Sequence, residues 1–519
     1  MELKINWKKV SWLVVGVAVL FKLYIIFFQY HFHNFLVPPS PDLVSHLQMT
    51  DHFINGTAVL GSYPPLLHIL TAFLAKLFSA TSLEIYSAIG PYWIPAAIIV
   101  FYLLVYKIFD YKIAFWATLV FGLVSANPLL NFGDAQYADI LGYNLIGPFY
   151  ILGFISLIKD FKYWKIPLVF LLFVLFLSAH HLSAVLIYIV SVISLVISCI
   201  IARKKDKSEY KKSAFTLLVF VIGAFVFLAL SRIFFGDLLS TVFDAVIHAK
   251  DLIQDSTSEV LDYSNIPSLL PALIEFVGLM GIGFLFIRIT GDKKTRFASI
   301  FIIVWIVMIW IFSRSSLFVL PQRIFREISL PLSIAAGIFV VDISCLLKSR
   351  WQKIMFFSLF AYLVIINSVQ LFVPPFLLPD GFKNQVWFRD VDQDKFEYIK
   401  ENVPVGPVIM TNYSNTVLQY KLIKEGYSLK YFSGSDKDLT TNEQKAQLVQ
   451  DEITQANASY LFIGFLPEGV NPDVYFTQYP NYQEATEILN TYQYKRDSLI
   501  KQFPDGSKLI RVNPSPTAK

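Results

Sequence analysis

Two short acidic segments hold the residues of this chain that could do chemistry. The first, PPSPDLVSH at 38–46, contains Asp42 and His46, and the second, GDAQYADILG at 133–142, contains Asp134 and Asp139. Long apolar stretches flank both segments. Carboxylates are rare near membrane spans unless they work in a water-filled site, because hydrocarbon penalises their charge. If both segments lie on one side of the membrane, they predict a single catalytic cavity lined by carboxylates.

Asp42 is expected in the first turn of a short helix, because Ser40 suits the N-cap and Pro41 the first helical position. His46 follows at i+4 on the same face. The alternative is that Asp42 only complements the helix dipole, a contribution of roughly 0.3–1 kcal/mol. Asp134 and Asp139 are five residues apart and do not share a helical face, so only one is expected to point into the cavity. Spacing does not separate them, and a polar collar for the next span is the alternative.

Three arginines depart from the expected distribution of positive charge. The loop FSRSSLFVLPQRIFRE at 312–327 is external when spans are counted, yet it contains Arg314, Arg323 and Arg326. Guanidinium groups bind phosphate through paired hydrogen bonds, so these arginines indicate an anionic ligand at the outer membrane surface. Snorkelling to lipid head groups is the alternative. Arg323 and Arg326 share an i, i+3 face and are the preferred phosphate contacts.

A histidine pair, His180 and His181, stands at the outer end of a span in SAHHLSA. Such a pair could ligate a metal, bond a phosphate or shuttle a proton. Ordinary interfacial polarity is the alternative, favoured for His180, so His181 is the candidate ligand contact. Lys22 and Lys76 lie in apolar segments and are expected to snorkel outward without a role.

Composition places these residues in a polytopic membrane protein. Apolar residues make up 55% of the chain and charged residues 16%. Eleven stretches are of spanning length: 10–29, 86–106, 113–130, 141–158, 166–183, 184–202, 213–234, 268–288, 297–313, 328–347 and 354–373. The segment 64–78 is short and begins with two prolines, so an interfacial or re-entrant helix is expected there. With that choice, every loop expected in the cytoplasm is rich in Lys or Arg.

The same count predicts the orientation of the chain in a cell membrane. Lys4, Lys8 and Lys9 precede the first span and read as an uncleaved signal anchor with the N-terminus in the cytoplasm. An odd number of spans places the C-terminal segment outside. The expected domains are a transmembrane domain at 1–377, an extracytoplasmic α/β domain at 378–512 and a disordered tail at 513–519.

The α/β expectation rests on alternating patterns after residue 378. Helices are expected at 393–402, 414–425 and 439–456, and strands at 406–410, 459–465 and 508–512. The two cysteines, Cys199 and Cys345, fall in apolar spans and offer no disulfide framework. No phosphate-binding GxxxxGK[ST] loop, GxGxxG, GxSxG or HExxH motif occurs, and no basic aromatic patch indicates nucleic acid.

These segments, in this order, resemble the GT-C fold of polyprenol-linked glycosyltransferases, which include oligosaccharyltransferase catalytic subunits and protein O-mannosyltransferases. The matching features are the acidic first loop with Asp42, YPPLLH at 63–68, the second acidic loop, HHLSA, PQRIFR before LPLSIAAG, and the C-terminal α/β domain. The resemblance covers about residues 1–375. The chain departs from oligosaccharyltransferases in lacking a WWD-type signature in the C-terminal domain and a clean DxD in the second loop.

The resemblance implies transfer of a sugar from a polyprenyl-phosphate donor to an acceptor hydroxyl, with inversion. Asp42 would be the general base, and Arg323 with Arg326 would stabilise the departing lipid phosphate. Asp134 or Asp139 would bind a divalent metal, Mg or Mn, or orient the acceptor, and Asp42 with Asp134 is the tentative metal-binding pair. Membrane lipids are the other expected partners, and the acceptor is unknown.

Three alternatives to this function remain open. A transporter or flippase would place polar residues or helix breaks near the bilayer midplane and would show two related halves. A polymerase or ligase of lipid-linked polysaccharide would use external arginines without needing Asp42. A structural scaffold would display the C-terminal domain and has no use for either acidic loop.

Overall fold

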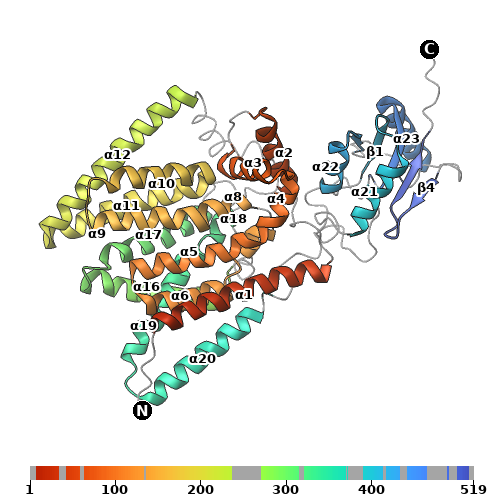
Figure 1. Cartoon of the computed structure of the whole chain (residues 1–519). Coiled ribbons are helices and arrows are strands. Elements are labelled where there is room, and N and C mark those ends of the chain that lie inside the picture. Colours follow the sequence, from red (N-terminus) through yellow and green to blue (C-terminus); the bar gives the residue numbers. More distant parts are fainter. Residues whose placement is uncertain are drawn as a thin grey trace. The chain divides into compact units, whose positions relative to one another are not determined.

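The computed structural model describes residues 7–33, 42–58, 63–133, 136–235, 270–314, 321–369, 371, 390–412, 416–432, 441–464, 485, 488–489 and 499–512. Two compact units are present. The first comprises Met1–Phe27 with Met49–Leu377, and the second Phe28–Gln48 with Leu378–Lys519 (Figure 1).

The first unit is a bundle of apolar helices. Nine helical segments of the described residues are long and apolar enough to cross a membrane: Lys8–Phe28, Ser82–Ile108, Tyr111–Phe132, Tyr137–Lys159, His181–Arg203, Ala272–Gly291, Arg296–Ser313, Ile324–Leu346 and Arg350–Val369. These nine correspond to nine of the eleven spans expected from sequence. The other two, 166–183 and 213–234, are also helical, as α10 (Lys165–Ala179) and α12 (Lys207–Phe235). The chain is therefore a multi-pass membrane protein.

Several of these segments are built from more than one helical element. The span Ser82–Ile108 consists of α4 (Ser82–Ile89), η1 (Gly90–Tyr92) and α5 (Trp93–Ile108). The span Tyr111–Phe132 consists of α6 (Tyr111–Leu119), η2 (Val120–Val124) and most of α7 (Leu129–Gly133). The span Tyr137–Lys159 consists of α8 (Tyr137–Asp139), η3 (Ile140–Ile146) and α9 (Gly147–Lys159). The other helices of the unit are α1 (Trp7–His33), α2 (Asp42–Asn55), α3 (Leu66–Phe78), α11 (His181–Lys205), α16 (Ala272–Gly291), α17 (Arg296–Ser313), α18 (Pro321–Arg326), α19 (Ser329–Leu346) and α20 (Arg350–Val369). Helix α1 belongs to this unit only up to Phe27, and helix α2 only from Met49 onward.

Helix α3 covers the segment expected to be re-entrant. Its 13 residues span about 20 Å at 1.5 Å per residue, which is shorter than the hydrocarbon core. A capping box at Thr81 and Glu84 then starts α4. This agrees with a short apolar helix between the first two spans.

Close helix packing holds the centre of the bundle together. Helix α19 packs against α16 and α6. At Gly281 on α16 a Cβ would lie 2.1 Å from the carbonyl oxygen of Ala335 on α19, so only glycine permits this approach. One large buried cluster of aliphatic and aromatic side chains runs through these helices and fixes the ends that carry the site described below.

The second unit contains a five-stranded sheet with helices. The strand order is β2-β1-β3-β5-β4, with β1 parallel to β2 and β3, and β5 antiparallel to β3 and β4. The elements are α21 (Asp390–Asn402), β1 (Val408–Thr411), α22 (Thr416–Lys424), β2 (Ser428–Tyr431), α23 (Asn442–Ala456), β3 (Ala458–Ile463), β4 (Leu499–Gln502) and β5 (Lys508–Arg511). The expected α/β class is confirmed, although β2 and β4 are not expected from the sequence pattern.

Candidate functional site: a buried carboxylate–histidine cluster

Three helix ends in the first unit bring ionisable side chains together. Asp139 ends the three-residue helix α8, His180 is the N-cap of α11, and Glu327 lies in the turn between α18 and α19. Each of these positions lies at an interruption of regular α-helix, which lets a side chain near a helix end turn inward. The site therefore depends on the irregular backbone of three separate segments.

Gly142 allows two of these segments to approach. It lies in the π-helical element η3, directly after Asp139, and a Cβ added there would be 2.5 Å from the Cβ of His180. Real Cβ atoms do not approach so closely, so any larger residue would push α11 and η3 apart. Glycine at this position thus sets how near His180 can come to Asp139.

The three ionisable groups form a compact cluster. One ligand atom of each of Asp139, His180 and Glu327 lies within 4.8 Å of the others. His180 Nδ1 is 3.5 Å from Asp139 Oδ1. Asp139 and Glu327 are 5% and 2% exposed, whereas the His180 side chain is 23% exposed. Two carboxylates repel one another strongly in such a buried place, so the arrangement needs positive charge or a shared proton.

Ser183 links all three groups. Its Oγ lies 2.6 Å from His180 Nδ1 and 3.4 Å from Asp139 Oδ1, and it hydrogen-bonds Glu327 Oε1. The hydroxyl carries a single proton, so it serves one acceptor at a time. The Ser183 hydroxyl can therefore redirect its proton to whichever of the three groups accepts it.

The donor set fits a divalent cation. Glu327 Oε2 is buried and has no hydrogen-bond partner among the described residues. Asn131 Nδ2 donates to Asp139 Oδ2, which leaves Asp139 Oδ1 directed at His180. An orphaned carboxylate oxygen beside a second carboxylate and an imidazole nitrogen is a ligand set used by Mn²⁺ and Zn²⁺, and the carboxylates also suit Mg²⁺.

Hydrogen bonds from neighbouring helices fix the turn that carries Glu327. The Tyr143 hydroxyl donates to the Glu327 carbonyl oxygen at 2.6 Å, and Asn127 Nδ2 donates to the Arg326 carbonyl oxygen at 3.0 Å. The Tyr143 ring packs edge-on against Trp305 with centroids 5.9 Å apart. These contacts orient the Glu327 backbone and so preorganise the cluster.

Lys22 is not a snorkelling residue. Its side chain is fully buried, and Nζ donates to the Ser125 carbonyl oxygen at 2.6 Å. Ser125 follows the end of η2, where carbonyl groups without helical partners concentrate negative partial charge. The expectation of outward snorkelling was wrong for Lys22 because the helix break supplies a carbonyl inside the bundle. Lys76, by contrast, is exposed.

The other residues predicted from the sequence lie as follows. Asp42 is the first residue of α2 and His46 is buried on the same helix, but the Asp42 side chain lies outside the described residues, as do Asp134 and the Arg323 side chain. His181 is the first residue of α11 and is not one of the three residues of the cluster. Arg326 ends α18, and the Arg314 guanidinium stacks over the Trp310 ring at 4.8 Å.

Sequence reasoning did not single out Glu327, and it favoured ordinary polarity for His180. A signal was present for Glu327, since it is a carboxylate directly before the apolar run ISLPLSIAAG. That position is costly for a charge without a function. Only the fold shows that the residue before this run reaches Asp139.

The comparisons with known proteins establish the fold. No family model and no curated protein matches the sequence. The apo crystal structure of the Archaeoglobus fulgidus oligosaccharyltransferase matches with a TM-score of 0.57 at 10% identity over 87% of this chain and 69% of that one. The same organism's oligosaccharyltransferase AglB, in complex with an inhibitory peptide and a dolichol-phosphate, matches with a TM-score of 0.55 at 12% identity over 88% and 70%.

A second enzyme shows the same likeness. The arabinofuranosyltransferase AftD from Mycobacteria matches with a TM-score of 0.52 at 11% identity, over 98% of this chain but only 40% of that longer one. Both proteins are glycosyltransferases of the GT-C fold. The chain therefore has the GT-C fold in a multi-pass membrane protein, as the sequence resemblance indicated.

Proposed function

We propose that this protein is a membrane glycosyltransferase that moves a sugar from a polyprenyl-phosphate-linked donor to an acceptor on the outer face of the membrane, with inversion. The observation that carries the proposal is the buried cluster of Asp139, His180 and Glu327 within a GT-C fold. The dolichol-phosphate bound by the related AglB supports a lipid-linked donor.

The cluster is the proposed metal site. Asp139, His180 and Glu327 would hold a divalent cation, which when bound supplies positive charge that stabilises a departing phosphate. A structure of the Archaeoglobus fulgidus oligosaccharyltransferase with Zn and sulfate, at a TM-score of 0.53, supports metal binding in this fold. The set differs from the Asp42 and Asp134 pair expected from sequence. Asn131 and Ser183 would keep the carboxylate oxygens oriented.

The remaining roles follow from the chemistry of the transfer. Asp42 would accept the proton of the acceptor hydroxyl as its oxygen attacks the anomeric carbon, while the bond from that carbon to the phosphate oxygen breaks. The lipid phosphate leaves as an anion and needs charge stabilisation rather than a proton. We assign that stabilisation to Arg323 and Arg326, with Arg314 and His181 as further phosphate contacts and His46 as an acceptor contact.

Transfer assays with purified protein test the function. Radiolabelled polyprenyl-phosphate sugars are offered to four proteins: wild type, Glu327→Gln, Asp42→Asn and the control Glu275→Gln. The thermal stability of each protein is measured first, so that loss of activity is not confused with loss of folding. Glu275 is a half-buried carboxylate in the first turn of α16, outside the cluster. We expect sugar transfer by wild type and by Glu275→Gln, and loss of transfer in Glu327→Gln and Asp42→Asn.

Each other outcome has a distinct meaning. Retained transfer by Asp42→Asn with loss in Glu327→Gln removes Asp42 as the base and keeps the cluster. Retained transfer by Glu327→Gln removes the cluster from the reaction. No transfer by wild type with any donor contradicts the proposed function, and flipping of the same lipids in proteoliposomes would then identify the transporter alternative.

A further inference from the structure

A second polar region lies at the opposite ends of the helices that carry the cluster. Asp139 and Lys159 are at the two ends of one candidate span, and His180 and Asp206 flank the two ends of α11. A helical span of 23 residues extends about 35 Å, enough to cross the hydrocarbon core. The two regions therefore face opposite sides of the membrane.

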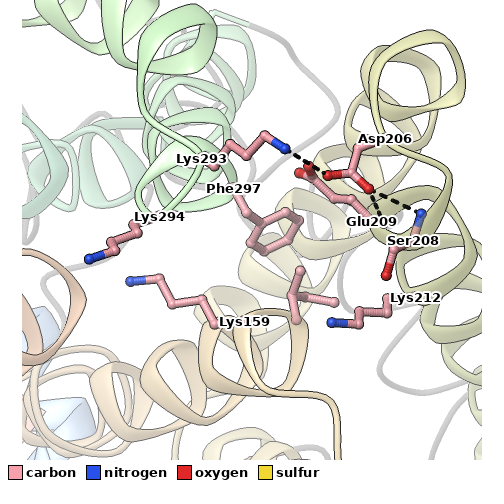
Figure 2. Close-up of a pocket in the computed structure, with 9 residues that line it drawn as sticks. Lys159, Asp206, Ser208, Glu209, Lys212, Lys293, Lys294 and Phe297 are labelled. Carbon is pink, nitrogen blue, oxygen red and sulfur yellow. Dashed lines mark hydrogen bonds and ion pairs between the residues drawn. The ribbon is translucent and has the colours of Figure 1, made fainter.

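This region contains a cavity of about 440 Å³. Its charged lining comes from Lys159 at the end of α9, from the start of α12 and from the turn between α16 and α17. The charged residues are Lys159, Asp206, Glu209, Lys212, Lys293 and Lys294. Figure 2 shows these side chains arranged around the ring of Phe297. We call this cavity the lysine pocket.

Both carboxylates of the lysine pocket already have basic partners. Lys293 forms an ion pair with Asp206, marked by a dashed line in Figure 2, in which Nζ lies 3.2 Å from Oδ2. Arg296 Nη1 lies 2.7 Å from Glu209 Oε2. Hydrogen bonds from the backbone N–H of Glu209 and from Lys293 lower the pKa of Asp206. Asp206 is therefore a carboxylate at neutral pH and neutralises Lys293.

Two lysines of the pocket form no ion pair with any described carboxylate. Within the described part of the chain, Lys212 and Lys294 form no ion pair, and both are exposed. Lys159 Nζ donates to the Ile108 carbonyl oxygen at 2.7 Å, and the carboxylate of Asp292 lies close enough to interact with its charge. The pocket thus presents the exposed ammonium groups of Lys212 and Lys294 to a ligand, and Lys159 also lines it.

The walls of the pocket are held rigid before any ligand binds. Asp206 caps α12 by accepting from the backbone N–H groups of Ser208 and Glu209. The buried Arg296 side chain also donates to the Ile289 carbonyl oxygen at 2.9 Å, which joins α16 to α17 and α12. Such preorganisation lowers the entropy cost of binding.

We propose that the lysine pocket binds a phosphate-bearing anion on the membrane face opposite the cluster. A membrane phospholipid head group and a soluble phosphate compound share this chemistry, and lysine-lined pockets between spans suit both. The volume fits a head group of small-molecule size, and Phe297 offers an apolar contact beside the charges. This proposal does not depend on the proposed glycosyltransferase activity.

Binding to purified full-length protein tests the proposal. The probes are short-chain phosphatidylglycerol, short-chain phosphatidylcholine, inorganic phosphate and pyrophosphate, each titrated while thermal stability and binding are measured. The variant is Lys212→Gln/Lys294→Gln, whose exposed positions can change without disturbing the fold. The matched control is Lys348→Gln/Lys353→Gln, two exposed lysines near the α19–α20 turn at the same end of the bundle.

We expect wild type and control to bind phosphatidylglycerol in preference to phosphatidylcholine, and the double variant to bind it roughly tenfold or more weakly. Salt should weaken this binding. Binding of phosphate or pyrophosphate but not phosphatidylglycerol, with the same loss in the double variant, supports the site and identifies a soluble source. Equal binding by variant and wild type, or no preference for any anion, overturns the proposal.

Discussion

The two units of this chain bury carboxylates in opposite ways. In the second unit, Lys395 is fully buried and lies 2.5 Å from Asp505 and 3.2 Å from Asp392. In the first unit, Glu327 and Asp139 lie within 4.8 Å of one another together with His180. One arrangement contains its own cation, and the other gathers groups of like charge.

The difference separates a structural ion pair from a binding site. Removing one member of a buried ion pair leaves an uncompensated charge, so such a pair resists change. Like charges held together cost stability instead, and proteins retain them where a ligand or a reaction uses them. The comparison predicts opposite responses when a charge is removed from each unit.

Neutralising one carboxylate of the cluster should have the largest effect on activity. We expect Glu327→Gln or Asp139→Asn to lower glycosyl transfer roughly 10²–10³-fold, because a ligand of the phosphate-stabilising charge is lost. Thermal stability should stay equal or rise, because repulsion between carboxylates is relieved. Metal binding by the purified variants, measured by calorimetry with Mg²⁺, Mn²⁺ and Zn²⁺, should weaken in parallel, whereas Glu275→Gln should behave as wild type. A clear loss of stability in Glu327→Gln would show that the cluster is structural.

The second unit should respond in the reverse sense. We expect Lys395→Met to destabilise it by about 3–5 kcal/mol, because Asp392 and Asp505 lose their buried partner. Hydrogen exchange of the sheet strands measures this local stability in the full-length protein. Lys400→Met on the same helix is the matched control, because Lys400 pairs with Glu425 at the surface and its loss should change little. Similar exchange in both variants would contradict the structural role of Lys395.

A change at Gly142 should sharpen the geometric argument for the cluster. We expect Gly142→Ala to lower transfer about tenfold or more, because its Cβ would collide with that of His180. Gly283→Ala in α16 is the control, because a Cβ there meets no atom within 4 Å. Wild-type activity and metal affinity in Gly142→Ala would mean that the distance between His180 and Asp139 is not critical.

The smallest expected effect is a pH dependence of the second unit. Burial alone would raise the pKa of Asp505, but the Lys395 ammonium and the Ser507 hydrogen bonds outweigh it and hold the pKa below its ordinary value of 3.8. A carboxyl group whose folded pKa is lowered stabilises the fold above the unfolded pKa, and this contribution is lost as pH falls through the folded pKa. The stability of the second unit, measured by hydrogen exchange of its strands, should therefore decrease progressively between pH 5 and 3. Asp505→Asn should flatten that dependence, whereas a change at the exposed Asp451 should leave it intact.

The sequence predicted the class of this protein with few errors. Spans of about twenty apolar residues can only cross a membrane as helices, so nine of the expected spans reappear with boundaries shifted by a few residues. The strands β1 and β3 were found because they are apolar and largely buried, and β5 was found from its buried pair Leu509 and Ile510 close to Val512. The strands β2 and β4 were missed because SLKY and LIKQ are short and half polar, and pairing with a neighbour decides their structure.

The candidate site was only partly visible in the sequence. Asp139 was a candidate together with Asp134, and the sequence did not separate the two. Its partners were not assigned, because His180 and Glu327 lie far from it along the chain and no short motif joins them. The local pattern around each of these residues is equally compatible with ordinary interfacial polarity.

The amino-acid sequence by itself thus determined the helical membrane bundle, the α/β unit and the acidic loops. Hydrophobicity and backbone hydrogen bonding act locally, so helices and strands leave recognisable patterns of apolar residues in the sequence. The tertiary structure alone decided that three helix ends converge, that Gly142 permits the approach, and that Lys22 turns inward to a carbonyl oxygen. Those outcomes depend on which helix ends meet, and the packing of side chains distant in sequence decides that.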